Sequence, residues 1–319
     1  MKKIAVLTSG GDAPGMNAAL RAVVRSAIYR GLQVLGVKKG YNGLIEGNMV
    51  EMDVSSVADI IHRGGTILGT ARSDEFKTEE GIEKALDKLR VLEIDGLVVL
   101  GGDGTMRGAL ELSKRGIPVA CIPCTIDNDL GYTDYAVGFM TATETVADAI
   151  SRLRDTSSSH GRANVVEVMG RRCGDIALYS GLAGGAETIV VPEVAFDLDA
   201  LLRKVLRGKN RGKRHHIIVL AEGAGNPYEI SEAIQKTAEM ETRVTILGHV
   251  QRGGTPTVFD RIMASQMGSM AVDLLYNGEK DRAIAINCNK IVSVPIEDAL
   301  KTQKLFQHEL LETAGMLAI

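Results

Sequence analysis

The feature that most constrains this chain is a unit that recurs along it. In each copy, a short run of β-branched apolar residues leads into a loop that combines glycine with Asp, Asn or Glu. In several copies a helical pattern follows the loop, as in 17–29, from the loop at 101–105 to about 114, and in 139–154. The apolar runs span 4–7, 97–100, 119–122, 165–168 and 217–220.

Apolar strands that alternate with amphipathic helices predict parallel sheets that are covered on both faces. A chain of 319 residues is long for one core, so we expect two domains. The predicted fold class is therefore α/β, with two Rossmann-like three-layer domains, mainly parallel sheets and an active site in the cleft between them. Ligands of such sheets bind beyond the carboxyl ends of the strands, where the glycine loops would lie.

Composition excludes several classes of function. A formal net charge of -3 argues against a nucleic-acid binder that depends on a broad basic surface. The apolar runs are far shorter than a membrane span, and the N-terminus lacks the pattern of a signal peptide, so we expect a soluble, cytoplasmic protein. Cys121 and Cys124 have C-x-x-C spacing, but no second pair completes a zinc site, which favours buried, reduced thiols.

Two glycine loops of the first half suit phosphate. The loop 10–17 offers backbone N–H groups at a helix start, although a Gly-Gly turn can also be only a tight turn. It matches neither the P-loop nor the dinucleotide-binding fingerprint. The string 101–105 adds a carboxylate, Asp103, at the end of a strand, where it could hold Mg²⁺.

The string 125–129 is the sharpest element of the sequence. In an extended segment Thr125, Asp127 and Asp129 project to one side. Two carboxylates beside a hydroxyl suit proton abstraction from an alcohol by Asp127 and organisation of a metal by Asp129. The alternative is an Asx-turn loop without chemistry.

The second half supplies basic residues for phosphate. Arg162, Arg171, Arg243 and the string 248–254, which contains His249 and Arg252, are candidates because arginine binds phosphate bidentately. The stretch 203–216 holds seven Lys or Arg and two His, and is either a helix end with a solvated loop or a second anion site. Arg21 and Arg25 share a helix face that could join such a site.

Five motifs together resemble bacterial ATP-dependent 6-phosphofructokinase, in the same order and over essentially the whole chain. They are Thr-Ser-Gly-Gly-Asp-x-Pro-Gly-Met-Asn, Gly-Gly-Asp-Gly, Thr-Ile-Asp-Asn-Asp, Glu-Val-Met-Gly-Arg and Leu-Gly-His-Val-Gln-Arg-Gly-Gly. The resemblance implies transfer of the γ-phosphoryl of ATP to the 1-hydroxyl of D-fructose 6-phosphate, which gives fructose 1,6-bisphosphate and ADP with Mg²⁺. It implies a larger ATP-binding domain, 1–138 plus 251–301, and a smaller fructose-6-phosphate domain, 139–250 plus 302–319.

The resemblance also implies residue roles. The catalytic positions are Asp127 as general base with Thr125, Asp129, Arg72, Arg171 and Gly11. The ATP positions are Gly11, Tyr41, Arg72, Ser73, Gly102, Asp103, Gly104, Thr105 and Gly108, and Asp103 and Asp129 match the metal positions. The sugar-phosphate positions are Thr125, Ile126, Asp127, Arg162, Met169, Gly170, Arg171, Glu222, Arg243, His249, Val250, Gln251 and Arg252.

Members of the family are typically homotetramers that ADP activates and phosphoenolpyruvate inhibits at one inter-subunit site. Arg162 and Arg243 match residues that reach the sugar phosphate from a neighbouring subunit. The positions that match the effector site are Arg21, Ala22, Val23, Val24, Arg25, Asp59, Arg154, Gly185, Ala186, Glu187, Arg211, Lys213, Arg214 and His215.

Some positions depart from the family's pattern. Cys124 stands where ATP users usually carry Gly and pyrophosphate users Lys, Thr105 replaces the more usual Ser, and Val54 replaces an effector Arg found in some relatives. Gly104, where pyrophosphate users tend to carry Asp, supports ATP as the donor. The alternatives are another kinase with a Gly-Gly-Asp-Gly-Thr loop, such as an NAD or lipid kinase, a pyrophosphate-dependent enzyme, and a catalytically silent nucleotide sensor.

Overall fold

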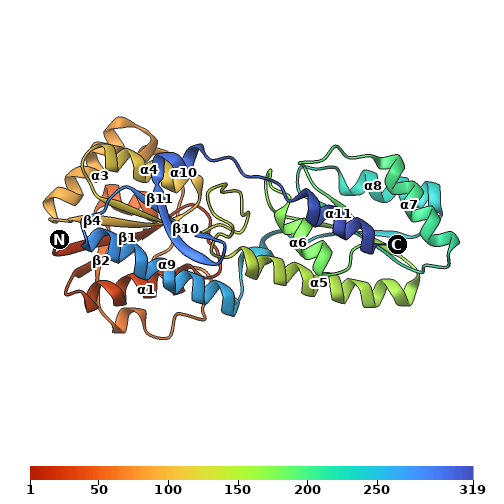
Figure 1. Ribbon diagram of the computed structural model, residues 1–319, viewed down its shortest axis with the longest axis horizontal. Helices are drawn as coiled ribbons and strands as arrows, with labels where there is room; N and C mark the ends of the chain where they lie inside the picture. The colour runs from red at the N-terminus through yellow and green to blue at the C-terminus, as the bar shows by residue number, and fades with distance from the viewer. Residues whose placement is uncertain (319) are drawn as a thin grey trace. The chain divides into compact units, whose positions relative to one another are not determined.

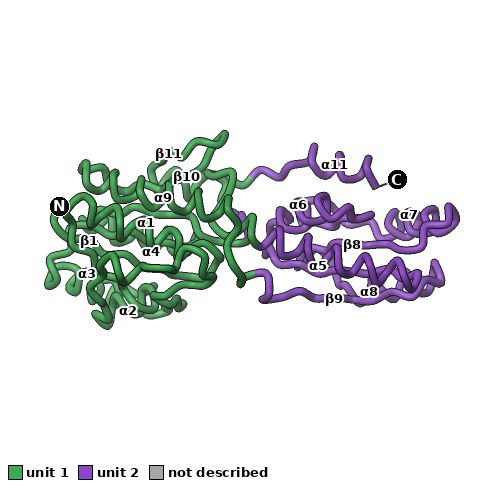
Figure 2. Tube along the Cα trace, turned by 90° about the horizontal axis from the view of Figure 1, so that it is seen from below, with its two compact units in different colours: residues 1–126, 130–141, 252–304 green, residues 127–129, 142–251, 305–319 purple. Residues whose placement is uncertain are grey.

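The computed structural model describes residues 1–318 (Figure 1). The chain forms two compact units, which Figure 2 draws in different colours. Unit 1 comprises 1–126, 130–141 and 252–304, and unit 2 comprises 127–129, 142–251 and the segment from 305 onward.

This division differs from the predicted domain boundaries chiefly at 127–129, which we placed with the first domain. The reason is a set of contacts with unit 2. The Asn128 side chain donates to Asp175 Oδ2 at 2.8 Å, and the Cys173 thiol approaches the Asn128 carbonyl oxygen at 3.8 Å. Smaller differences fall at 139–141 and 302–304, which belong to unit 1, and at Gln251, which belongs to unit 2.

Unit 1 is built on a sheet of order β11-β10-β5-β4-β1-β2-β3. The five central strands are parallel, and the edge strands β3 and β11 run antiparallel to their neighbours. The strands are β1 (Lys3–Thr8), β2 (Gln33–Val37), β3 (Met49–Met52), β4 (Gly96–Gly101), β5 (Val119–Pro123), β10 (Arg282–Asn287) and β11 (Lys290–Pro295).

Helices cover both faces of this sheet, so β4 and β5 are buried at every position. In Figure 1, α3, α4 and α10 lie on one face and α1 and α9 on the other. The helices are α1 (Met16–Tyr29), α2 (Gly40–Glu46), α3 (Glu79–Val91), α4 (Asp103–Lys114), α9 (Val258–Tyr276) and α10 (Ile296–Lys301), with short 3₁₀ helices η1 (Ser55–Val57) and η2 (Glu75–Lys77).

Unit 2 is built on a fully parallel sheet of order β7-β8-β6-β9. The strands are β6 (Ala163–Val168), β7 (Thr188–Val190), β8 (His216–Ala221) and β9 (Thr242–Ile246). The helices are α5 (Phe139–His160), α6 (Asp175–Ala183), α7 (Leu198–Asn210), α8 (Pro227–Ala238) and α11 (His308–Leu317), with the 3₁₀ helix η3 (Gly248–Arg252).

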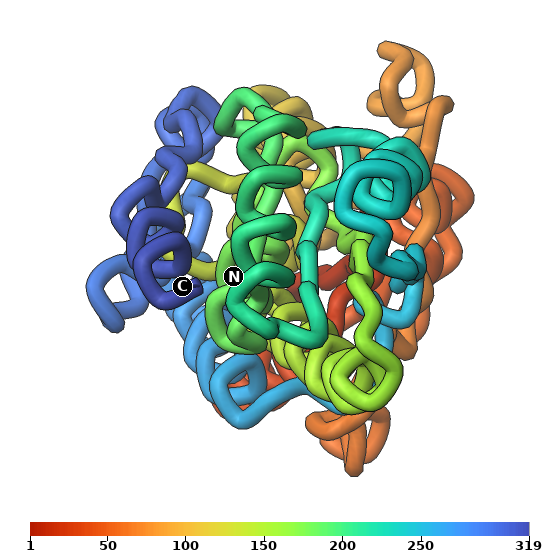
Figure 3. Tube along the Cα trace, turned by 90° about the vertical axis from the view of Figure 1, so that its right-hand side faces the viewer, coloured from red at the N-terminus to blue at the C-terminus, as the bar shows by residue number. Residues whose placement is uncertain are grey.

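The side chains of β7 and β8 assign these helices to the two faces of the sheet. Val190 and Ile218 share a buried cluster with Leu201 of α7 and Ile234 of α8. On the opposite face, α6 packs so closely that a Cβ on Gly181 would lie 2.7 Å from the Ile189 side chain. Figure 3 shows α11, in dark blue, beside the green α6.

The predicted fold class is confirmed: the molecule is α/β, with two layered units and mainly parallel sheets. All five predicted strands form, as β1, β4, β5, β6 and β8. The third predicted helix, 139–154, extends six residues further, to His160. Within residues 1–318, no helix combines the length and the apolar character needed to span a bilayer.

A buried histidine generates a prediction about stability. His216 begins β8 with 2% of its surface exposed, and neither ring nitrogen has a hydrogen-bond partner within residues 1–318. Burial is the main cause that lowers its pKa from 6.5 to about 4, with smaller contributions from nearby cations.

His216 is therefore protonated below about pH 6.5 in the unfolded chain, but only below about pH 4 in the folded chain. We expect the free energy of unfolding of unit 2 to fall by about 3 kcal/mol across this range. Urea unfolding at pH 7 and pH 5 should detect about 2 kcal/mol of this fall, since pH 5 lies above the folded pKa. His216→Phe should remove most of this pH dependence, whereas His160→Phe, at an exposed position, should retain it; equal pH dependence in both variants would contradict the assignment.

Candidate active site

The first glycine loop follows β1 in unit 1. Its backbone is held by Thr70, whose hydroxyl donates to the Gly10 carbonyl oxygen at 2.6 Å. The next glycine leaves room for a guanidinium: a Cβ on Gly11 would lie 1.5 Å from Arg252 Nη2. Arg252 in turn pairs with Asp12, with Nε 3.5 Å from Oδ1. The structure thus places Arg252, which we expected to contact the sugar phosphate, over the Gly11 loop.

The second glycine loop joins β4 to α4. A Cβ on Gly101 would lie 2.4 Å from Thr105 Oγ1 and 2.6 Å from the Ser9 carbonyl oxygen, so only glycine allows this approach. By contrast, the space beside Gly104 is open within 4 Å. Thr125 lies at the same edge of unit 1, because a Cβ on Gly102 would be 3.7 Å from the Thr125 Cβ.

Asp103 opens α4, and its carboxylate is 43% exposed. It accepts hydrogen bonds from Arg107, one turn later, at 2.8 and 3.1 Å. Among residues 1–318, no group of three or more His, Cys, Asp or Glu side chains could hold a metal ion. A single accessible carboxylate still fits Mg²⁺, because this ion usually keeps several waters and binds one or two protein carboxylates together with phosphates.

Tyr41 supports the start of α4 from beneath. Its hydroxyl donates to the Thr105 carbonyl oxygen at 2.6 Å, and its ring stacks on Phe76 with 4.0 Å between ring centroids. A Cβ on Gly108 would lie 2.9 Å from this ring. With 5% of its surface exposed, Tyr41 holds the glycine loop 101–105 in position through packing and one hydrogen bond.

The remaining predicted nucleotide residues lie on the loop 63–73. Arg72 is exposed, Ser73 is half-buried, and the Arg72 carbonyl oxygen accepts from Asn42 at 3.2 Å. The loop depends on Asn17, a residue to which we assigned no role. Its amide donates to the Arg63 and Gly64 carbonyl oxygens and accepts from the Ile67 N–H. The sequence offered one indication of this role, a single Asn near the start of an otherwise apolar helix.

In unit 2, the predicted base lies beside the predicted arginine. Asp127 is 6% exposed, and Arg171 Nε lies 3.2 Å from its Oδ2. Arg171 Nη1 lies 3.8 Å from Asp129 Oδ2. Asn128, which adopts a φ of 52°, is fixed by Asp175, so the two carboxylates on either side of it are held in place.

The turn that presents Arg171 is strained and is held by Glu222. Gly170 has a φ of 140° and Arg171 one of 56°. A Cβ on Gly170 would lie 2.3 Å from the Cys173 carbonyl oxygen. Glu222 Oε1 accepts from the backbone N–H groups of Gly170 and Arg171 at 3.2 and 2.7 Å, and the Gln251 side chain accepts from the Met169 N–H at 3.1 Å.

The other predicted sugar-phosphate residues divide by exposure. His249 and Val250 are exposed on η3, whereas Gln251 is fully buried. Ile126 is 3% exposed and belongs to unit 1.

Arg162 and Arg243 meet at a carboxylate that the sequence analysis did not single out. Arg162 Nε lies 2.8 Å from Glu241 Oε2, and Arg243 bonds the other oxygen of Glu241. Arg162 precedes β6, while Met169 follows it, so this pair lies at the opposite end of the strand from Arg171. Six residues at about 3.3 Å each separate the two ends by about 20 Å.

Four of the predicted effector residues, Arg154, Gly185, Lys213 and His215, assemble around a fifth, Glu187, in unit 2. Arg154 donates to the Gly184 and Gly185 carbonyl oxygens at 2.7 Å and lies 3.4 Å from Glu187 Oε1. Lys213 Nζ lies 3.2 Å and His215 Nε2 3.9 Å from the same oxygen. Burial alone would raise the pKa of Glu187, but the Ile217 N–H and the surrounding cations lower it overall. Ala186 is buried beside this cluster, while Arg211 and Arg214 are exposed.

The remaining effector residues belong to unit 1. Arg21 and Arg25 are half-buried on α1, and Asp59 is exposed. Val23 and Val24 are fully buried in the core and Ala22 packs against Gly268, so these three side chains serve packing.

Cys124 is 1% exposed, and burial raises the pKa of its thiol. Cys121 is likewise fully buried, which agrees with the expectation of reduced, inert thiols.

Comparisons with known proteins identify the family of this chain. A family model described as phosphofructokinase matches residues 3–275. The ATP-dependent 6-phosphofructokinase of Finegoldia magna is 61% identical over 319 residues, which cover 100% of both chains. A solved phosphofructokinase from Saccharomyces cerevisiae is 37% identical with a TM-score of 0.90, and the alignment covers 100% of this chain and 48% of the yeast chain.

A pyrophosphate-dependent phosphofructokinase from Marinobacter aquaeolei has a TM-score of 0.89 at 20% identity, with 99% of this chain and 88% of that chain covered. At this identity the likeness concerns the fold alone. Because the family model covers most of the sequence and the bacterial relative matches it from end to end, the chain belongs to the phosphofructokinase family.

Proposed function

We propose that this chain is an ATP-dependent 6-phosphofructokinase, which moves the γ-phosphoryl of ATP to the 1-hydroxyl of D-fructose 6-phosphate and yields fructose 1,6-bisphosphate and ADP. The observation that carries the proposal is the buried carboxylate of Asp127 with Arg171 at 3.2 Å, in a chain that is 61% identical to an enzyme of that name.

Asp127 is the general base. It accepts the proton of the sugar 1-hydroxyl as the hydroxyl oxygen attacks the γ-phosphorus, and a positioned base of this kind contributes about 10²–10⁴ in rate. Arg171 fixes the orientation of the carboxylate, and the strained turn that Glu222 holds fixes Arg171. Thr125 is joined to Asp127 through a single residue and supports the same segment.

The loops of unit 1 receive the nucleotide. The backbone of 102–105 at the start of α4 approaches the phosphates, and Gly11 and Arg72 border them. Asp103, once released from Arg107, and Asp129 are the carboxylates that would hold Mg²⁺, and the ion would supply positive charge to offset that of the phosphates. The larger domain, predicted as 1–138 plus 251–301 and corresponding to unit 1, is the ATP-binding domain. The smaller domain, predicted as 139–250 plus 302–319 and corresponding to unit 2, binds the sugar phosphate.

Two features favour ATP over pyrophosphate. The space beside Gly104 is open, which leaves room for the rest of a nucleotide. Cys124 points its thiol into the core, so it supplies neither the bulk nor the charge of a lysine at that position.

Arg162 and Arg243 bind the 6-phosphate of a sugar held by a neighbouring subunit. Within one chain they lie about 20 Å from the end of β6 that carries Met169 and Arg171, so they cannot serve the same sugar as these residues. Such sharing requires at least one neighbouring subunit, and we propose a homotetramer with shared active sites. ADP and phosphoenolpyruvate bind at an inter-subunit site, to which one subunit contributes the cationic cluster around Glu187 and another contributes Arg21 and Arg25. The enzyme works in the cytoplasm.

A coupled assay of fructose 1,6-bisphosphate formation tests the function. We expect turnover with Mg²⁺ and ATP, little or none with pyrophosphate, and saturation curves that shift with ADP and phosphoenolpyruvate. Turnover with pyrophosphate alone would contradict the inference of an ATP donor from Gly104 and Cys124. No turnover with either donor would favour another kinase or a silent sensor.

Asp127→Asn should lower kcat by a factor of 10² or more and leave ATP binding unchanged, because the amide cannot accept the proton at this position. Asp155→Asn, an exposed position of α5, makes the same change of charge and should keep full activity. Steady-state kinetics and calorimetric titration of ATP separate the two effects. An Asp127→Asn enzyme within a few-fold of wild type would remove Asp127 from the role of base.

The sharing of sites is tested by mixing two inactive variants, Arg162→Ala and Asp127→Asn, after reversible dissociation. Each mixed interface joins an intact Asp127 to an intact Arg162, so an equal mixture should recover about a quarter of the wild-type sites. Either variant treated alone should stay inactive. If the mixture recovers nothing although mass spectrometry shows mixed oligomers, Arg162 does not act across subunits.

A further inference from the structure

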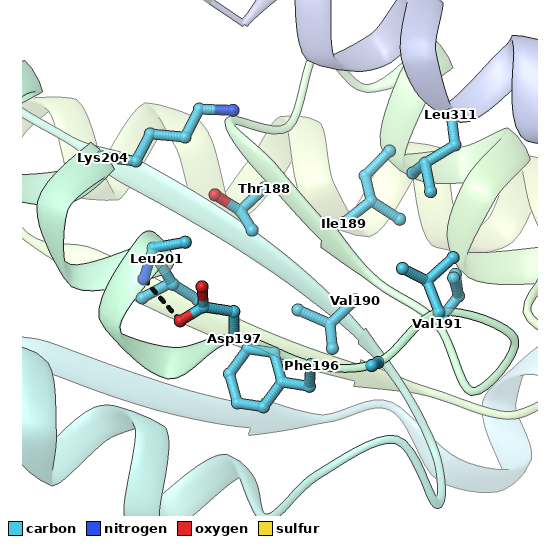
Figure 4. Close-up of a pocket in the computed structure, with 12 residues that line it drawn as sticks. Thr188, Ile189, Val190, Val191, Phe196, Asp197, Leu201, Lys204 and Leu311 are labelled. Carbon is cyan, nitrogen blue, oxygen red and sulfur yellow. Dashed lines mark hydrogen bonds between the residues drawn. The ribbon is translucent and has the colours of Figure 1, made fainter.

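A pocket of ≈ 240 Å³ lies in unit 2, and none of its lining residues was given a role above (Figure 4). It opens between the edge strand β7, the segment 191–197 that follows it, and the first turns of α7. Leu311 of α11 closes one side.

The walls of the pocket are apolar. Figure 4 shows Val190, Val191, Phe196, Leu201 and Leu311 around the space. Val190 and Leu201 belong to the buried cluster beneath α7, whereas Phe196 is 37% exposed at the mouth. A ligand that enters the pocket would cover the exposed apolar surface of Phe196, and this burial would favour binding.

One end of the pocket is polar and positively charged. Lys204 and Thr188 line it, and Figure 4 labels both side chains. The Thr188 Oγ1 is buried and has no hydrogen-bond partner within residues 1–318. A buried hydroxyl without a partner is destabilising, so a ligand oxygen at this end of the pocket would supply the missing hydrogen-bond partner.

Lys204 is the cationic side chain that lines the pocket and that an anionic ligand would contact. Burial lowers the pKa of Lys204, while Glu187 opposes this shift without an ion pair to it. Asp197, the carboxylate among the lining residues, is already engaged: it accepts from the Ala200 N–H at 2.9 Å and lies 3.6 Å from Arg203. His216 is neutral at pH 7, because its pKa is about 4.

We propose that this pocket binds a small monocarboxylate with a branched or aromatic apolar body. The body lies against Val190, Leu201 and Phe196, one carboxylate oxygen pairs with the Lys204 ammonium, and an oxygen accepts the Thr188 hydroxyl proton. A single lysine among apolar walls suits one negative charge, whereas phosphate is normally met by several N–H donors or arginines.

The volume sets the size of the ligand. An apolar cavity of about 150 Å³ holds benzene, so the larger pocket here holds a body of roughly six to ten non-hydrogen atoms. Leu201 and Lys204 lie three residues apart on α7 and therefore share a face, which places the cation at one end of the apolar wall.

The test uses 4-methylpentanoate as the probe and the intact protein with labelled methyl groups. We expect the methyl signals of Val190, Leu201 and Leu311 to shift on titration, with an affinity at least about tenfold above that of acetate or 4-methylpentan-1-ol. The first control lacks the apolar body and the second lacks the charge.

Two variants assign the polar end. Lys204→Met should weaken binding by about tenfold or more, whereas Lys236→Met, an exposed position of α8, makes the same change of charge and should have no effect. Thr188→Val should weaken binding less and should leave the unliganded protein at least as stable, since the hydroxyl it removes has no partner.

Equal affinity of wild type and Lys204→Met for the acid would overturn the proposal. So would equal affinity of the wild type for the acid and the alcohol, or unshifted pocket methyl signals up to the solubility of the probe.

Discussion

Both sheets of this protein are covered on each face, and this burial confines its polar chemistry to the ends of the strands. A strand such as β4 or β8, buried at every position, cannot carry a charged group along its length. In unit 1 the glycine loops use the carboxyl ends of β1 and β4. Unit 2 uses both ends of its sheet, with Asp127 and Arg171 near one end of β6 and the Arg162 pair and the Glu187 cluster near the other.

Much of this could be predicted from the sequence. The five apolar runs each became a parallel strand, because short β-branched segments between glycine loops have few other stable arrangements. The pairing of Asp127 with Arg171 was expected from motif resemblance, and the structure supplies its geometry. What the sequence could not reveal are contacts between residues far apart in the chain, such as Asn17 with 63–67 or Asn128 with Asp175. These depend on how loops pack, and a single polar residue carries no periodic signal.

Two carboxylates act in the same way in different parts of unit 2. Glu187 gathers Arg154, Lys213 and His215, and Glu241 gathers Arg162 and Arg243. Cations placed this close would repel one another without a counterion. The sequence motifs drew attention to the basic residues, yet Glu187 and Glu241 determine where those basic side chains lie. Sequence reasoning noted Glu187 only through family resemblance and did not note Glu241.

The position of Glu241 has a consequence for the phosphate site that we propose at Arg162 and Arg243. Both arginines already hold an anion of their own chain, and each is partly exposed to water. A phosphate that binds there exchanges one negative partner for another, so its affinity reflects the difference between two sets of ion pairs. A dianion with three acceptor oxygens gains from this exchange, whereas a singly charged competitor gains little. The glutamate thereby makes the arginine pair selective as well as ordered.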